Sequence, residues 1–315
     1  MDMRRESLPM CEGSNVGAVG AMNTLCLPGY GTFELRSAET GLVYEIFVWV
    51  PEGEAPPLGF PVLYVLDANS DFLTVSETVR RVSRKPAATG VTPSIVVGIG
   101  YPNTANYDMG RRYRDLTLSG PHGSADQGGA AYGGQGAFLR FLEQQLVPCI
   151  QAQYHAHADR RSIVGHSLAG YFVLEMLAHR TALFDGFVSF SPSIWWDKAG
   201  LRERLSQKAE PVPGRRVYLA VGRYEQDPSP WSNGHEQDED YHALRAQRRM
   251  VDNARELAAD IVNTIGSGGD VRFEIGEEED HATIVTTLLC RALRFVQPIE
   301  VASLGRESWQ SFSPR

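Results

Sequence analysis

The chain has 315 residues, which is enough for one large α/β domain or two small ones. Its net charge of −8 argues against a nucleic-acid-binding protein, which would usually carry a basic surface, and no apolar run approaches the ~18 residues that span a bilayer. The four cysteines are scattered without a C-x-x-C pair, so the sequence predicts neither a zinc site nor a disulfide framework.

The first 29 residues resemble a tail more than a folded segment or a signal peptide. They carry Arg4 and Arg5, but Glu12, Asn15 and several glycines break the stretch that follows. We predict a flexible N-terminal tail over 1–29, a second tail over 301–315, and a cytoplasmic location. An atypical export signal and a periplasmic location are the alternative.

Between these tails, strand and helix patterns alternate. A β-hairpin is expected within 31–50. Apolar runs of strand length follow at 61–66, 94–100, 162–164, 187–190, 217–221 and 271–275. Helical patterns lie at 138–154, 169–179, 240–265 and 283–295. Runs that are apolar throughout are typical of strands buried on both faces of a parallel sheet. The pattern therefore predicts one α/β domain over 30–300, with a mostly parallel central sheet flanked by helices.

A serine stands alone between small residues where the third of these runs meets a helix. The sequence Gly165-His166-Ser167-Leu168-Ala169 fits the small-x-Ser-x-small pattern of a nucleophile elbow. Such a turn is so tight that only small side chains fit at its flanks. The helix that follows would direct the amide of Leu168 at a developing oxyanion. The alternative is that Ser167 is an ordinary helix N-cap.

A serine nucleophile needs a histidine base, which in this fold class comes after the acid in the chain. Beyond the helix that follows Ser167, the chain has His235, His242 and His281. His281 follows the last strand pattern and precedes the last helix, where the base belongs. His235 and His242 are expected to be solvated, and the alternative for His281 is an exposed histidine at a helix start.

The acid is expected after the strand at 217–221. Glu225 is the first carboxylate there, and Asp227 is the second candidate. The alternative is that both belong to a solvated acidic loop.

A second oxyanion donor is expected from the loop after the strand at 61–66. This loop reads Asp67-Ala68-Asn69, and the small Ala68 would let a substrate approach the backbone N–H groups of Ala68 and Asn69. Asp67 and Asn69 could equally be turn-forming residues.

Motifs along residues 30–297 resemble the Putative esterase family of α/β hydrolases, and within it the enterochelin (siderophore) esterase-like enzymes. The matching stretches are PVLYVLDAN (61–69), VVGIGYP (96–102), YDMGRRYRDLT (107–117), FLRFLEQQLVPCIQAQY (138–154), DRRSIVGHSLAG (159–170), FSPSIWWD (190–197), VGRYEQ (221–226) and EDHATIV (279–285). The resemblance implies an α/β-hydrolase fold with Ser167 as nucleophile, His281 as base and a carboxylate near Glu225. Ala68 and Ala169 stand where many relatives have glycine.

The resemblance also implies substrate-binding residues. Arg111 and Arg112 would bind an anionic catecholate–iron complex, since guanidinium groups suit a multiply charged oxygen ligand. Trp195 and Trp196 would stack on aromatic acyl groups. The alternatives are structural ion pairs for the arginines and core packing for the tryptophans.

The sequence therefore predicts a serine hydrolase that cleaves carboxylic esters through an acyl-enzyme and needs no cofactor. The expected partner is a small-molecule ester, first of all the trilactone of a catecholate siderophore, with or without iron, and the chain would then serve iron acquisition. A general carboxylesterase for short-chain or aromatic acyl esters is the runner-up. A non-catalytic binding protein on a hydrolase scaffold is the alternative from another class.

Overall fold

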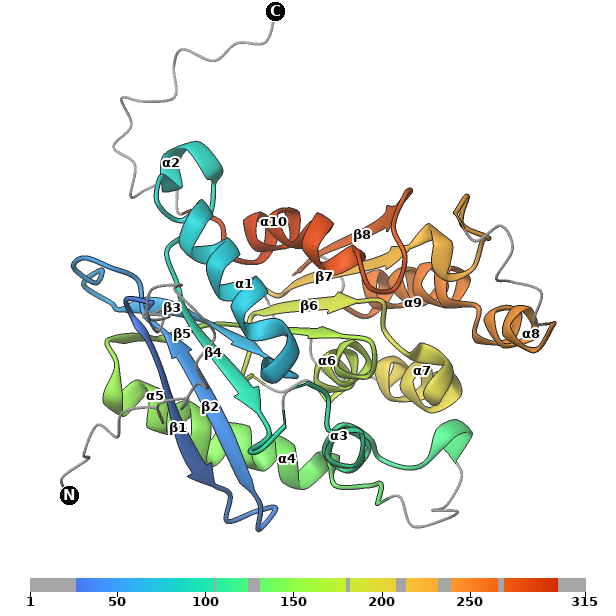
Figure 1. Cartoon of the computed structure of the whole chain (residues 1–315), viewed down its shortest axis with the longest axis horizontal. Helices are drawn as coiled ribbons and strands as arrows, with labels where there is room; N and C mark the ends of the chain where they lie inside the picture. Colours follow the sequence, from blue (N-terminus) through green and yellow to red (C-terminus); the bar gives the residue numbers. More distant parts are fainter. Residues whose placement is uncertain are drawn as a thin grey trace, which may run out of the picture.

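The computed structural model describes residues 27–299 except 105, 124–130, 180–181, 208–213, 232–238 and 266–268. Within them, strands form one sheet in the order β1-β2-β4-β3-β5-β6-β7-β8 (Figure 1). The strands are β1 (Tyr30–Arg36), β2 (Val43–Trp49), β3 (Phe60–Val65), β4 (Ile95–Gly100), β5 (Ala156–His166), β6 (Gly186–Phe190), β7 (Arg216–Gly222) and β8 (Asp270–Gly276). The predicted tails fall outside the described residues except for 27–29.

The sheet is antiparallel at one edge and parallel over the rest. β1 and β2 form the predicted hairpin, and β2 pairs antiparallel with β4. From β4 through β3, β5, β6 and β7 to β8, every neighbouring pair is parallel. The predicted α/β class with a mostly parallel sheet is confirmed.

Both faces of the sheet are covered by helices. The helices are α1 (Ala68–Val82), α2 (Pro86–Thr89), α3 (Met109–Leu116), α4 (Gln135–Phe141), α5 (Val147–Gln153), α6 (Leu168–Ala178), α7 (Lys198–Ser206), α8 (Glu239–Arg248), α9 (Met250–Ile265) and α10 (Ile284–Val296). α1 and α10 pack on one face, and α4, α5, α6 and α9 pack on the other (Figure 1). No helix among the described residues is long and apolar enough to cross a membrane.

The alternating direction of side chains along the central strands produces two hydrophobic clusters, one on each face of the sheet. On β3, Val62 and Tyr64 belong to one hydrophobic cluster, and Leu63 and Val65 belong to the cluster on the opposite face. All four are nearly inaccessible to solvent. Side chains of a strand point alternately to its two faces, so a strand buried on both must be apolar throughout, as the sequence indicated.

Two helical regions differ from the prediction. The pattern at 240–265 forms two helices, because Arg249 adopts a left-handed conformation (φ 44°) between α8 and α9. Residues 135–153 are continuously helical, with a π-helical turn (Leu142–Leu146) joining α4 to α5. α1, α3 and α7 were not predicted as helices.

The parallel register brings the functional candidates together. Strands β3, β5, β6, β7 and β8 run in the same direction. The segments that follow them therefore lie together at the carboxyl ends of these strands. These segments contain Asp67–Asn69, Ser167, Ser191–Trp196, Glu225 and His281.

Candidate active site

Ser167 lies at a sharp turn between β5 and α6. Its backbone has φ 61° and ψ −119°, a conformation that L-residues adopt only under constraint. A Cβ on Gly165 would lie 2.5 Å from the carbonyl carbon of Ala169, and one on Gly170 would lie 2.8 Å from the Phe190 carbonyl oxygen. A residue without a Cβ is therefore required at Gly165, as the elbow pattern predicts, and also at Gly170, one position beyond the pattern's second small residue, Ala169. Ser167 occupies the N-cap position of α6, but its side chain makes no capping hydrogen bond, so the alternative of an ordinary N-cap is not supported.

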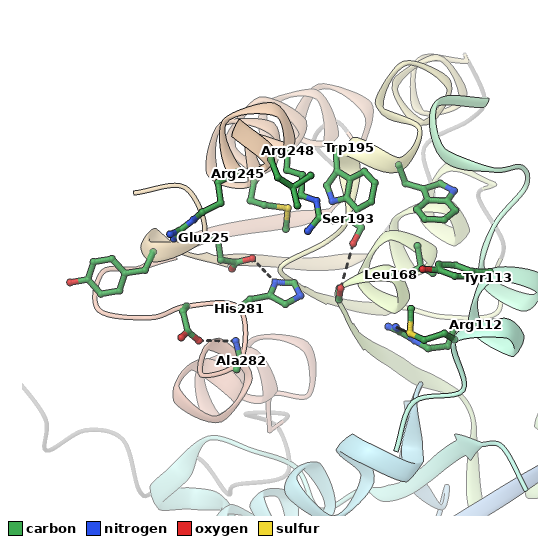
Figure 2. Close-up of a pocket in the computed structure, with 17 residues that line it drawn as sticks. Arg112, Tyr113, Leu168, Ser193, Trp195, Glu225, Arg245, Arg248, His281 and Ala282 are labelled. Atoms are coloured by element: carbon green, nitrogen blue, oxygen red, sulfur yellow. Dashed lines mark hydrogen bonds and ion pairs between the residues drawn. The ribbon is translucent and has the colours of Figure 1, made fainter. Parts of the chain in front are cut away.

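His281 and Glu225 form a close pair. His281 Nδ1 lies 2.6 Å from Glu225 Oε2 (Figure 2). The other carboxylate oxygen, Oε1, accepts hydrogen bonds from the Gly222 N–H at 2.7 Å and from the Ser191 hydroxyl. With Nδ1 bound to Glu225, the imidazole keeps Nε2 for another partner. This arrangement can orient a base and stabilise its protonated form.

The second candidate acid lies away from this pair. The Asp227 side chain is 55% exposed, and its Oδ2 lies 3.5 Å from Arg223 Nη1. The Glu225 side chain is only 2% exposed. The structure thus places Glu225, not Asp227, against the histidine.

A cavity of about 460 Å³ opens over these groups. Its lining includes Ser167, Leu168, Glu225 and His281. Figure 2 shows the His281 ring with Glu225 on one side and Ser193 on the other. Ser193 Oγ lies 3.4 Å from Ser167 Oγ, and either hydroxyl can be the donor. The predicted nucleophile, base and orienting carboxylate therefore line one solvent-accessible cavity.

Of the three expected oxyanion-hole residues, only Leu168 lines the cavity. As the first residue of α6 it has an N–H with no partner inside the helix. Ala68 is buried, and Asn69 holds the loop after β4 by accepting from the Tyr101 N–H (2.8 Å) and donating to the Thr104 carbonyl (2.9 Å). Asn69 thus has the structural role that the sequence left open, and an amide contribution from Ala68 or Asn69 stays a prediction.

The two arginines expected to bind substrate have separate roles. Arg112 lines the cavity, and its Nε donates to both carboxylate oxygens of the buried Asp67 at 3.0 Å. Arg111 lies outside the cavity wall: its guanidinium packs over Tyr44 and donates to the Val43 carbonyl at 3.1 Å. Arg111 therefore corresponds to the structural alternative, and its expected contact with substrate is not supported.

Both tryptophans line the cavity, in different ways. Trp196 is buried, stacks on Tyr113 with ring centroids 5.3 Å apart, and donates from Nε1 to the Ser119 carbonyl at 3.0 Å. Trp195 is only partly buried and carries the Arg248 guanidinium over its ring at 4.5 Å. Trp196 is thus held in the cavity wall by its contacts. The Trp195 ring and the Arg248 guanidinium that lies over it both line the cavity.

Several residues of the site were not predicted from the sequence. Ser191 and Ser193 follow β6, and Arg245 and Arg248 lie about one turn apart on α8, with Ser193 and both arginines lining the cavity. The only sequence signal for the serines was the stretch Ser191-Pro192-Ser193 after a strand. The i, i+3 spacing of the arginines indicates that they share one face of a helix, but the sequence does not show that this face of α8 lies over the cavity.

His166, next to the nucleophile, packs against the predicted base. The rings of His166 and His281 lie 4.5 Å apart, and the buried His166 Nε2 has no hydrogen-bond partner within the described part of the chain. Burial, followed by the neighbouring His281, lowers the pKa of His166 to about 3. His166 is therefore neutral at physiological pH and places no positive charge beside His281.

This neutral His166 should make the protein sensitive to acid. The unfolded chain takes up a proton at this residue near pH 6.5, and the folded chain only near pH 3, so the free energy of unfolding falls as the pH drops through this window. At pH 5 the contribution amounts to at most about 2 kcal/mol relative to pH 7. Urea unfolding at both values should show a smaller difference for His166→Asn than for the wild type. The exposed His179→Asn is the control, and an unchanged difference in His166→Asn would contradict this account.

The chain is similar to known esterases. Residues 37–272 match the model of the Putative esterase family. The chain is 34% identical to the ferri-bacillibactin esterase BesA of Bacillus subtilis over 288 residues, covering 88% of this chain and 92% of the relative. It is 30% identical to a siderophore enterobactin esterase of Emericella nidulans, with 79% and 86% of the two chains covered.

Solved structures give the same result. The BES protein from Bacillus cereus aligns with a TM-score of 0.75 and 27% identity, over 89% of this chain and all of that one. The siderophore hydrolase EstB from Aspergillus nidulans aligns with a TM-score of 0.73 and 27% identity, over 88% and 97%. With a serine at a strained elbow and a family match over most of its length, this chain belongs to the Putative esterase family and is a carboxylic ester hydrolase of the α/β-hydrolase fold.

Proposed function

We propose that the protein hydrolyses the ester bonds of a siderophore backbone through an acyl-enzyme on Ser167. The observation that carries the proposal is the cavity in which Ser167 lies with the His281–Glu225 pair and with three arginines, Arg112, Arg245 and Arg248. The names of the relatives from Bacillus and Emericella, both siderophore esterases, support the substrate class.

In the proposed reaction, Ser167, His281, Glu225 and Leu168 each take one role. Ser167 Oγ attacks the ester carbonyl while His281 Nε2 accepts its proton, and Glu225 stabilises the imidazolium that forms. The Leu168 N–H donates to the oxyanion of the tetrahedral intermediate. His281 then gives its proton to the departing alkoxide, and water cleaves the acyl-enzyme by the same steps.

The arginines and the Trp195 ring in the cavity lining fit an anionic, aromatic substrate. Arg112 is fixed by Asp67, and Arg248 lies on the ring of Trp195, so neither guanidinium needs to be ordered when a ligand binds. Guanidinium groups pair well with oxygen anions, and the tryptophan ring can stack on a catecholate ring. A catecholate trilactone, with its iron carried as part of the substrate, meets both requirements.

A substrate panel tests this proposal. We expect higher kcat/KM for a catecholate trilactone than for p-nitrophenyl acetate, and we expect Arg248→Ala to raise KM for the ferric trilactone about tenfold, the loss of one charge-assisted contact. The same variant should leave KM for p-nitrophenyl acetate nearly unchanged. Arg255→Ala, which removes an exposed arginine of α9 outside the cavity, is the control. Equal or better efficiency of the wild type on simple esters would instead favour the general carboxylesterase.

A cytoplasmic location is part of the proposal. Cys149 and Cys290, the cysteines among the described residues, are both free thiols. Free thiols are typical of a reducing compartment. Cell fractionation with an antibody against the chain tests this assignment.

A further inference from the structure

Ser193 is held against the nucleophile by two contacts. Its N–H donates to the Ser167 carbonyl oxygen at 3.1 Å, and its Oγ lies 3.4 Å from Ser167 Oγ. The residue is 5% exposed, yet it lines the cavity. The triad and the oxyanion hole described above leave this hydroxyl without a role.

The hydroxyl of Ser193 is poorly engaged within the protein. A separation of 3.4 Å is well beyond the usual 2.7 to 2.8 Å of a hydroxyl–hydroxyl hydrogen bond. Among the described residues, no other hydrogen bond of this hydroxyl is present. Buried hydroxyl groups are normally well paired. Ser193 is therefore positioned for an acceptor that the substrate brings.

The strand order indicates which substrate atom that is. On one side of β5, β3 leads to the loop from which the second oxyanion donor is expected. On the other side lie β6, β7 and β8, and the segments that follow these strands contain Ser193, Glu225 and His281, respectively. The leaving oxygen of the ester must lie within reach of His281, which protonates it. It therefore lies on the side of β5 from which Ser193 comes.

We propose that the Ser193 hydroxyl donates a hydrogen bond to the alkoxy oxygen of the ester as the departing alcohol leaves. The inference rests on the proposed role of Ser167 as nucleophile. When the acyl C–O bond breaks, its electron pair stays on the alkoxy oxygen, and the proton that neutralises it comes from His281. Ser193 keeps its own proton and stabilises the charge while that transfer proceeds. An aliphatic alkoxide, such as a trilactone releases, needs this help more than a nitrophenolate does.

Esters that differ only in their leaving group test the proposal. Acetates of phenols and alcohols of increasing pKa are hydrolysed by the wild type and by Ser193→Ala, and kcat/KM is measured for each. We expect a loss of roughly twofold for p-nitrophenyl acetate and of about 30- to 100-fold for an alkyl acetate, the range for a lost transition-state donor. Ser193→Thr, which keeps a hydroxyl, should recover most of the alkyl ester activity.

Two further measurements separate this role from others. Labelling by a fluorophosphonate, whose leaving group needs little assistance, should proceed at nearly the wild-type rate in Ser193→Ala, and Ser206→Ala, an exposed position on α7, is the matched control. An equal loss across all esters and in labelling would show that Ser193 only orients Ser167 and would overturn the proposal. No loss with any ester would overturn it as well. If the wild type itself is not labelled, the role of Ser167 fails instead.

Discussion

Ser167→Ala should abolish turnover and prevent covalent labelling by a fluorophosphonate probe. Removing the nucleophile of a serine triad lowers kcat on the order of 10⁴- to 10⁶-fold, because the remaining groups can only assist direct attack by water. The proteins compared by this measurement differ in one oxygen atom. The residual rate of the variant therefore reports what the oxyanion donor and the cavity contribute without a nucleophile.

The fold should survive this substitution. Ser167 makes no capping bond to α6, and alanine has the same difficulty as serine in adopting a φ of 61°. The midpoint of thermal unfolding should therefore stay within a few degrees of that of the wild type. Ser206→Ala should keep full activity and labelling. Labelling that persisted in Ser167→Ala would mean that another residue is the nucleophile.

Local constraints made the elbow predictable from the sequence. A tight strand-to-helix turn restricts the size of the side chains that flank it. The small residues Gly165 and Ala169 therefore indicate such a turn from the sequence alone. In the same way, the uninterrupted apolar runs of β3 and β4 indicate strands that are buried on both faces. The order of serine, acid and histidine then narrowed the candidates to a few positions.

Residues brought in by tertiary structure were not predictable in this way. Arg245 and Arg248 reach the cavity because the chain turns at Arg249, and a mixed-charge helical pattern does not show where such a turn falls. Ser193 acquires its place only when β6 pairs beside β5. Nothing local distinguishes it from any other serine after a strand.

The neighbouring arginines of α3 point to different surroundings. Successive residues on a helix point about 100° apart, so Arg111 and Arg112 could not both face one small cavity. The family resemblance implies substrate contacts for both arginines and does not take this helical geometry into account. The structure directs Arg112 to the cavity and Arg111 to the aromatic ring of Tyr44.

Glu225→Gln should be as damaging as Glu225→Ala, although glutamine is much closer in shape. Oε1 of Glu225 accepts from two donors, the Gly222 N–H and the Ser191 hydroxyl. In the variant these donors would select the amide oxygen of the glutamine for this position. Its NH₂ group would then point at His281 Nδ1, which must become the acceptor.

The tautomer that results has its proton on Nε2 of His281, so the ring cannot accept the proton of Ser167. We expect kcat to fall about 10³- to 10⁴-fold in Glu225→Gln, a loss of the size that the wrong tautomer causes in other serine triads. Glu225→Ala imposes no tautomer, so its loss should be no larger, even though it also removes packing. The ratio of the two rates thus separates tautomer control from the loss of the negative charge.

The control for this experiment is the other acid that the sequence allowed. Asp227 is exposed and paired with Arg223, so Asp227→Asn should change kcat by less than about twofold, as expected for an exposed pair outside the chemistry. A large loss in Asp227→Asn together with a small one in Glu225→Gln would move the acid to Asp227. Comparable activity of Glu225→Gln and the wild type would show that His281 needs no carboxylate partner, and the pair at 2.6 Å would then be structural.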